Sequence, residues 1–167
     1  GVKLLVFPGT FELTAEKRAA LDRYALKDGR TAVFVYAPGI SDGKTLDTER
    51  VMALTGTAFK TPGVTEAARG GWKAVYADTY DALTPQVLRR LAADAGVAIY
   101  CDDAVPVYAN ERLVAIHTAQ GGERTITLPK PCREVRELYT GQVIPVADKK
   151  FRYMFATPDT ALFETVD

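Results

Sequence analysis

The chain carries one histidine and two cysteines, the side chains that could form a nucleophile and its base. Cysteine-dependent hydrolases hold the nucleophile on a tight strand-to-helix turn, with a histidine and an acid within reach. Cys101 ends an apolar segment, but Asp102 and Asp103 follow it, and then further strands rather than a helix. His117 lies within an alternating strand pattern. The spacing permits a Cys101–His117 dyad, whereas the pattern favours a packed cysteine and a histidine on a strand.

Carboxylate side chains are numerous, and pairs of them carry out glycoside hydrolysis when held about 5–10 Å apart. The 21 acidic residues are spread along the chain, and no spacing singles out a catalytic pair. Asp102 and Asp103 are the most concentrated pair, and they follow the C-terminal end of a predicted strand, where ligands of α/β proteins tend to bind. They are candidate substrate-contact residues, although the pattern favours a polar turn between two architectures.

Three aromatic side chains, Trp72, Tyr76 and Tyr80, fall within one irregular segment. Exposed aromatic rings stack on sugars through apolar and quadrupolar contacts. The four-residue spacing would place these rings on one side of either a helix or a strand. We hypothesise that the segment lines a sugar site or meets a catalytic domain, with ordinary core packing as the favoured alternative.

No pattern in the sequence indicates a metal or a cofactor. One histidine and two separated cysteines make no zinc site, and Asp102 and Asp103 lack the spacing of a calcium loop. Lys44 and Thr45 follow the segment Gly39–Gly43, but only three residues separate its two glycines, whereas a phosphate-binding loop has four, so a turn is the favoured interpretation. We therefore expect no bound metal and no cofactor.

The charge balance argues against two classes of partner. Lysine plus arginine and aspartate plus glutamate both number 21, so the formal net charge is zero. Nucleic acids and anionic membrane surfaces attract a basic excess, which this chain lacks. No apolar run approaches the roughly 20 residues needed to span a bilayer. We therefore expect neither nucleic acid nor a membrane as a partner.

The elements that must position these residues begin with α/β patterning. Lys3–Phe7 and Thr31–Tyr36 are short apolar runs, typical of strands buried on both faces. Between them a helix is predicted from about Ala15 to Lys27, with Thr14 as its N-cap and Gly29 at its end. The three segments together predict a right-handed, parallel βαβ unit.

The middle of the chain is less regular. Leu46–Leu54 is typical of a short helix closed by Gly56. Residues 57–82 have no clear periodicity, apart from a candidate strand at Trp72–Tyr76.

A clear helix follows, because Thr84 is a good N-cap and Pro85 suits the first helical position. Gly96 ends this helix, and Val97–Cys101 is predicted as a third buried strand.

After Asp103 the helical periodicity disappears and short alternating strands replace it. Gly121-Gly122 and Thr140-Gly141 are hairpin signals. Strands are predicted over residues 105–109, 112–118, 123–128, 133–138, 142–146, 150–156 and 160–165. Short strands at this spacing predict an antiparallel sandwich. We therefore predict two domains, 1–103 and 104–167.

The segments Lys3–Arg18 and Leu21–Gly39 share a recognisable order of features. A strand ends in a proline turn before a Leu-Thr-x-Glu helix start, and an apolar strand closes with Pro-Gly. They resemble the middle domain of family 42 β-galactosidases and related hydrolases. Leu113–Pro129, Glu137–Gly141 and Thr160–Glu164 resemble the small β domain that ends many such hydrolases. The resemblance implies a glutamine-amidotransferase-like, non-catalytic domain that takes part in oligomerisation.

Two departures limit what the resemblance implies. The family domain normally has further α/β units before the strand at Lys3–Phe7, and the catalytic barrel with its paired glutamates is absent. No catalytic residue is therefore assigned in this chain.

The predicted fold class is α/β, a short parallel sheet with flanking helices of the flavodoxin or amidotransferase type, followed by a small antiparallel β-sandwich. The favoured function is a non-catalytic accessory or oligomerisation region of a larger, β-galactosidase-like glycoside hydrolase. The expected partners are the catalytic barrel of the parent chain, a second copy of the chain and carbohydrate. Two alternatives stay open, a stand-alone carbohydrate-binding module and a small amidotransferase-like hydrolase using Cys101.

Overall fold

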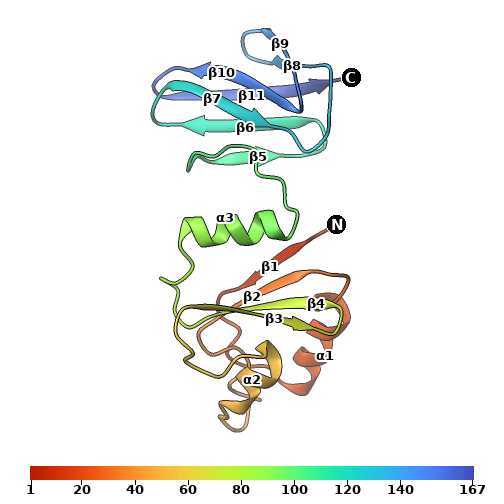
Figure 1. Ribbon diagram of the computed structural model, residues 1–167, viewed down its shortest axis with the longest axis vertical. Coiled ribbons are helices and arrows are strands. Elements are labelled where there is room, and N and C mark those ends of the chain that lie inside the picture. The colour runs from red at the N-terminus through yellow and green to blue at the C-terminus, as the bar shows by residue number, and fades with distance from the viewer. The chain divides into compact units, whose positions relative to one another are not determined.

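The computed structural model describes residues 1–167, which form two compact units, Gly1–Val97 and Ala98–Asp167 (Figure 1). The first unit contains three helices and four strands, and the second contains only strands, seven in number. No helix is long and apolar enough to cross a membrane. Each unit is described separately below.

The first unit is built on a mixed sheet. Its strand order is β1 (Leu4–Phe7), β2 (Thr31–Val35), β4 (Trp72–Ala77) and β3 (Val64–Arg69). The β1–β2 and β2–β4 pairs are parallel, whereas β3 pairs with β4 in antiparallel orientation. The purely parallel sheet expected from the sequence is therefore corrected to a mixed one.

The cause of the antiparallel pairing is a two-residue hairpin. Gly70 and Gly71 join β3 to β4, and Gly71 has a φ of +88°. Left-handed backbone of this kind is what tight hairpin turns require, and glycine adopts it at little cost. This glycine pair is the signal that identifies the hairpin within the irregular stretch 57–82.

Three short helices accompany the sheet. They are α1 (Ala15–Tyr24), α2 (Glu49–Thr55) and α3 (Pro85–Asp94). The two predicted N-caps are confirmed, because the hydroxyl of Thr14 accepts from the Lys17 amide and that of Thr84 accepts from the Val87 amide. These caps fix where α1 and α3 begin.

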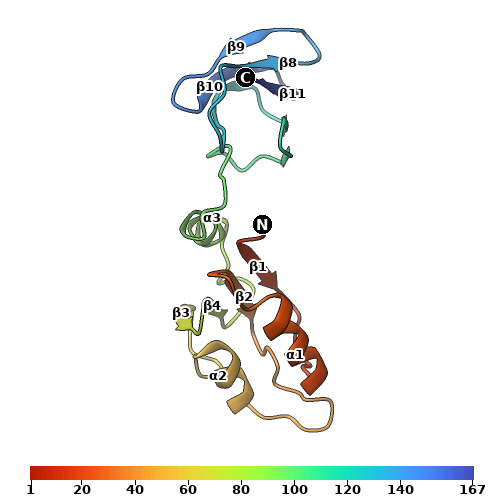
Figure 2. The same cartoon turned by 90° about the vertical axis from the view of Figure 1, so that its right-hand side faces the viewer.

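The alternation of β2 side chains produces two cores. Ala32 and Phe34 pack on one face with Leu54 of α2, whereas Val33 packs on the other face with Leu91 of α3. Figure 2 shows the same division, with α3 across the strands from α1 and α2. All five residues of β2 are buried, as predicted. By contrast β1 is an edge strand, and Val6 is 45% exposed, so the prediction that β1 is buried on both faces is wrong.

The second unit is an antiparallel β-sandwich. One sheet has the order β5 (Val107–Ala109), β6 (Leu113–Thr118), β11 (Asp159–Val166), β8 (Glu134–Glu137) and β9 (Val143–Pro145). The other pairs β7 (Gly122–Thr127) with β10 (Lys150–Phe155). All seven predicted strands are confirmed. Their inner faces form one core, in which Ile116 and Phe163 of the larger sheet lie with Ile126, Phe151 and Phe155 of the smaller.

The predicted third buried strand at Val97–Cys101 is absent. This segment is irregular, and the Tyr100 carbonyl accepts a hydrogen bond of 2.8 Å from the Thr127 amide of β7. Tyr100 also packs against the core of the second unit. The boundary between the units therefore falls after Val97 rather than at residue 103. The segment pairs with no strand of the first sheet, whose two edges are β1 and β3.

Candidate functional site

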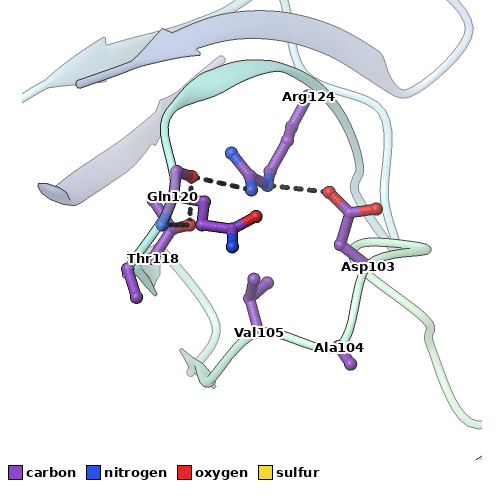
Figure 3. A pocket seen from close by; sticks show the side chains of 7 residues that line it. Asp103, Ala104, Val105, Thr118, Gln120 and Arg124 are labelled. Carbon is purple, nitrogen blue, oxygen red and sulfur yellow. Dashed lines mark hydrogen bonds and ion pairs between the residues drawn. The ribbon is translucent and has the colours of Figure 1, made fainter. Parts of the chain in front are cut away.

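A polar pocket lies in the second unit. It has a volume of about 400 Å³ and is bounded by the segment that precedes β5, by the end of β6 and by the turn into β7 (Figure 3). The side chains that line it include Asp103, Val105, Thr118, Gln120 and Arg124. The pocket is polar on most sides, because a carboxylate, a hydroxyl, an amide and a guanidinium all reach it.

Arg124 is the central residue of this pocket. Its side chain is only 11% exposed, and its guanidinium carbon lies 5.4 Å from the centre of the Phe155 ring. Nη2 donates a 2.9 Å hydrogen bond to the Gln120 carbonyl. Nε lies 2.7 Å from Oδ2 of Asp103, although its N–H is not well directed at an acceptor, so this contact is chiefly ionic. A buried guanidinium needs an anionic or hydrogen-bonding partner, because burying an unpaired charge costs roughly several kcal/mol.

The turn between β6 and β7 holds the rim of the pocket in place. The hydroxyl of Thr118 donates to the Gln120 carbonyl at 2.6 Å and accepts from the Gln120 amide at 3.2 Å. The Gly121 amide donates to the hydroxyl of Thr157 at 2.6 Å. These bonds fix the backbone of Gln120, and Figure 3 shows its side-chain amide directed into the cavity.

The structure separates the two predicted acidic candidates. Asp103 lines the pocket and forms the ion pair with Arg124, whereas Asp102 is not among the lining residues. Gln120 and Arg124, which line the pocket together with Asp103, lie 17 and 21 residues further along the chain. Sequence reasoning missed both, although the Gly121-Gly122 hairpin signal marks the turn that brings them to Asp103.

The aromatic candidates do not form one exposed platform. Tyr76 is completely buried, and Trp72 is half-buried with its ring edge-on to Phe34 at 6.3 Å between centroids. Tyr80 is 54% exposed and donates from its hydroxyl to the Pro8 carbonyl. A buried ring cannot stack on a sugar, so Tyr76 is removed from the candidate sugar contacts and takes a structural role instead.

That role is to hold two strained residues, Tyr36 at the end of β2 and Lys60 in the loop before β3. The Tyr76 hydroxyl donates to the Tyr36 carbonyl at 2.8 Å and accepts from the Lys60 amide at 3.0 Å. Tyr36 and Lys60 both have left-handed backbone, with φ of +63° and +62°. Such conformations cost about 1–3 kcal/mol each in non-glycine residues and persist only where the surroundings impose them. The ring of Tyr36 is thereby placed edge-on to Phe11 and Phe59, at 6.1 and 5.8 Å.

The cysteine and the histidine of the alternative dyad have structural environments. Cys101 is buried, and His117 pairs with Thr160 across β6 and β11, where Nδ1 lies 2.8 Å from the Thr160 hydroxyl. A reactive thiol needs access to its substrate and a setting that favours the thiolate. Burial of Cys101 therefore gives no support to a hydrolase built on this residue. No group of three or more His, Cys, Asp and Glu residues is arranged to hold a metal ion.

Comparison with known proteins identifies the fold. No protein-family model and no curated protein sequence matches the chain. A solved β-galactosidase from Bacillus circulans sp. alkalophilus matches 98% of this chain and 33% of its own, with a TM-score of 0.72 and 14% identity. A catalytic mutant of Gan42B, a GH42 β-galactosidase from G. stearothermophilus, matches 98% of this chain and 32% of its own, with a TM-score of 0.65 and 17% identity.

These matches define a fold that occurs within larger enzymes. The chain spans about a third of the length of the solved structures that it matches. It therefore has the fold of one region of a β-galactosidase chain, and this region includes both the mixed α/β unit and the β-sandwich.

Proposed function

We propose that this chain is a non-catalytic accessory region of a larger, β-galactosidase-like glycoside hydrolase. The observation that carries the proposal is the match of 98% of the chain to a third of a β-galactosidase. In this proposal the natural partner is the catalytic barrel of the parent chain, and the region contributes oligomer contacts or a wall of the active-site entrance.

The end of β2 has one feature in common with enzymes of the amidotransferase type, a strained residue directly after a strand. Enzymes with a nucleophile elbow place the reactive residue on a strained turn directly after a strand. Tyr36 follows β2 directly, with a φ of +63°, but a loop rather than a helix comes after it, because α2 begins only at Glu49. The residue at this strained position is a tyrosine, and its ring packs between Phe11 and Phe59. A tyrosine in these contacts supports a binding or packing role for the end of β2.

The edge of the first sheet supports a macromolecular partner. Parallel strands are usually covered on both faces and buried, yet β1 is an edge strand with Val6 45% exposed. Val2, which precedes it, is also exposed. An open apolar edge invites further strands or another surface. A second copy of the chain or the parent's barrel would cover it.

The proposal is tested by two measurements on the isolated chain. Light scattering at several concentrations should show a dimer or a trimer if the region supplies oligomer contacts. A monomer at all concentrations would contradict the oligomer contacts. The remaining proposed role would then be to form a wall of the active-site entrance. Assays with a chromogenic β-galactoside should show no turnover. Turnover that co-purifies with the chain and is lost on substitution of one of its carboxylates would overturn the accessory role.

A further inference from the structure

We propose that the Asp103–Gln120–Arg124 pocket binds a neutral, hydroxyl-rich small molecule of monosaccharide size. The inference goes beyond the accessory role and does not depend on it, because every residue that lines the pocket belongs to the second unit. It assigns to the β-sandwich a binding site of its own.

The size of the pocket suits a small ligand. Its volume of about 400 Å³ lies within the range of roughly 300–1,000 Å³ that is typical of small-molecule sites. Val105 supplies an apolar patch on one wall, whereas Asp103, Thr118 and Gln120 present polar atoms around it. This lining favours a hydrophilic molecule over an apolar one, since buried polar groups left without partners oppose binding.

The charges in the pocket favour a neutral ligand. Asp103 and Arg124 form an ion pair at 2.7 Å, so the two formal charges cancel. An anion would have to displace the Asp103 carboxylate from Arg124 and would then lie beside it, and Nη2 of Arg124 is already occupied by the Gln120 carbonyl. A cation would meet the guanidinium. The anion would be repelled by the displaced carboxylate nearby, and a cation that drew Asp103 away would leave the largely buried Arg124 without its partner, which is unfavourable.

The hydrogen-bonding groups suit neighbouring hydroxyls. The Gln120 side chain offers an acceptor oxygen and a donor NH₂ group, and it is directed into the cavity (Figure 3). The Asp103 carboxylate, in a side chain that is 55% exposed, adds acceptor oxygens. Each sugar hydroxyl both donates and accepts, so adjacent hydroxyls can bond to the amide and the carboxylate together.

The pocket is also preorganised. Two hydrogen bonds with the Thr118 hydroxyl hold Gln120, and the Thr157 hydroxyl holds Gly121. A Cβ added at Gly121 would lie 2.6 Å from that Thr157 hydroxyl and 2.7 Å from the Phe155 carbonyl, so any other residue here would force the turn to shift. A fixed turn lowers the entropy lost when a ligand orders its contacts.

The test is a titration of the ¹⁵N-labelled chain with galactose, followed by NMR. We expect saturable shifts of the Gln120 side-chain amide, the Gly121 amide and Arg124 Nε at roughly 10–100 mM, in line with a millimolar Kd. Sodium phosphate at the same concentrations should cause no saturable shift at these groups. Absence of saturable shifts with galactose, or stronger binding of phosphate than of galactose, would overturn the proposal.

Two substitutions locate the site. Gln120→Ala should weaken galactose binding at least tenfold while the remaining amide spectrum stays folded. Gln142→Ala, in the exposed turn before β9 and outside the pocket, should leave binding unchanged. Equal binding by Gln120→Ala and the parent chain would refute the assignment.

Asp103→Asn tests the charge argument separately. Removal of the carboxylate should weaken galactose binding and create measurable phosphate binding, because Arg124 would lose its anionic partner. A variant that stays folded and binds galactose as before, with no gain of phosphate binding, would contradict the proposed role of the ion pair. None of these measurements depends on the oligomeric state or on galactoside turnover. The proposed binding site can therefore be refuted without refuting the accessory role, and the reverse also holds.

Discussion

The carboxylate of Glu137, on β8, accepts a hydrogen bond of 3.2 Å from the backbone amide of Leu162, on β11. Its other oxygen accepts from both the amide and the hydroxyl of Thr140, each at 2.7 Å. Glu137 is 1% exposed, so these bonds compensate a charge buried beneath the β8–β9 hairpin. The segment Glu137–Gly141, whose pattern resembles that of a hydrolase β domain, is thus organised around one buried anion.

Glu137→Gln should destabilise the second unit by about 2–4 kcal/mol, because an amide has one acceptor oxygen and would set its NH₂ group against donors. Chemical unfolding followed through the second unit would measure the loss. Glu123→Gln serves as the control, since Glu123 is exposed and pairs with Arg152 only at 3.5 Å. It should change stability by less than about 1 kcal/mol. Equal effects of the two substitutions would show that the Glu137 network is not stabilising.

The same carboxylate should make stability depend on pH. Burial alone would raise the pKa of Glu137, but the hydrogen bonds from Thr140 and Leu162 outweigh it and hold the pKa below its ordinary value. The unfolded chain therefore binds the proton more readily than the folded chain. The stabilisation is present above the ordinary glutamate pKa of about 4.3 and is lost as the pH falls through the lower, folded-state value. The stability difference between the parent chain and Glu137→Gln should shrink over that acid range, and a constant difference would contradict this account.

Tyr76→Phe should loosen the end of β2, because the hydroxyl that bonds to both Tyr36 and Lys60 is removed. We expect a loss of about 1–3 kcal/mol, the cost of leaving buried backbone groups unpaired. Hydrogen exchange at the Lys60 amide should accelerate accordingly. Tyr24→Phe is the matched control in the same unit, since Tyr24 is largely exposed, and its exchange pattern should match that of the parent chain. Unchanged protection in Tyr76→Phe would mean that the strained residues are held by other contacts.

Gly121→Ala should destabilise the second unit by about 1–3 kcal/mol, the usual cost of overpacking. An added Cβ would lie 2.6–2.9 Å from Thr157 and from the backbone of Phe155 and Ala156. Gly70→Ala provides the comparison, because nothing lies within 4 Å of a Cβ at that position. Thermal unfolding of both variants would check the difference. A Gly121→Ala variant as stable as Gly70→Ala would show that the turn can shift freely.

The two cysteines should differ in reactivity. Burial raises the pKa of the Cys132 thiol, and the negative charge of Asp167 raises it further, so little thiolate forms near neutral pH. Cys101 is buried, whereas Cys132 is only half-buried. A thiol reagent followed by mass spectrometry should therefore modify Cys132 slowly at pH 7, faster as the pH rises above 9, and Cys101 later still. Rapid and selective labelling of Cys101 at neutral pH would instead favour the Cys101 hydrolase.

Local sequence patterns are sufficient to predict most of the helices and strands of this protein. Thr14 and Thr84 cap their helices, and Phe151, Tyr153 and Phe155 of β10 alternate inward with Arg152 and Met154 outward. Caps and strand alternation depend on residues within a few positions of one another, so they can be read from the chain directly. The glycine pair Gly70-Gly71 is a local signal of the same kind for the β3–β4 hairpin, although strand periodicity around it is too weak to predict β3.

Long-range pairing required the folded structure. Val97–Cys101 is as apolar as a buried strand, but it pairs with no strand of the first sheet, and Tyr100 packs in the second unit instead. The aromatic residues Tyr76 and Tyr80 look alike in sequence, yet one is buried and the other exposed. Asp103 meets Arg124 only because the β6–β7 turn folds back towards it. Periodicity specifies which face of an element is apolar, whereas the partner of that face depends on which other segments compete for it in three dimensions.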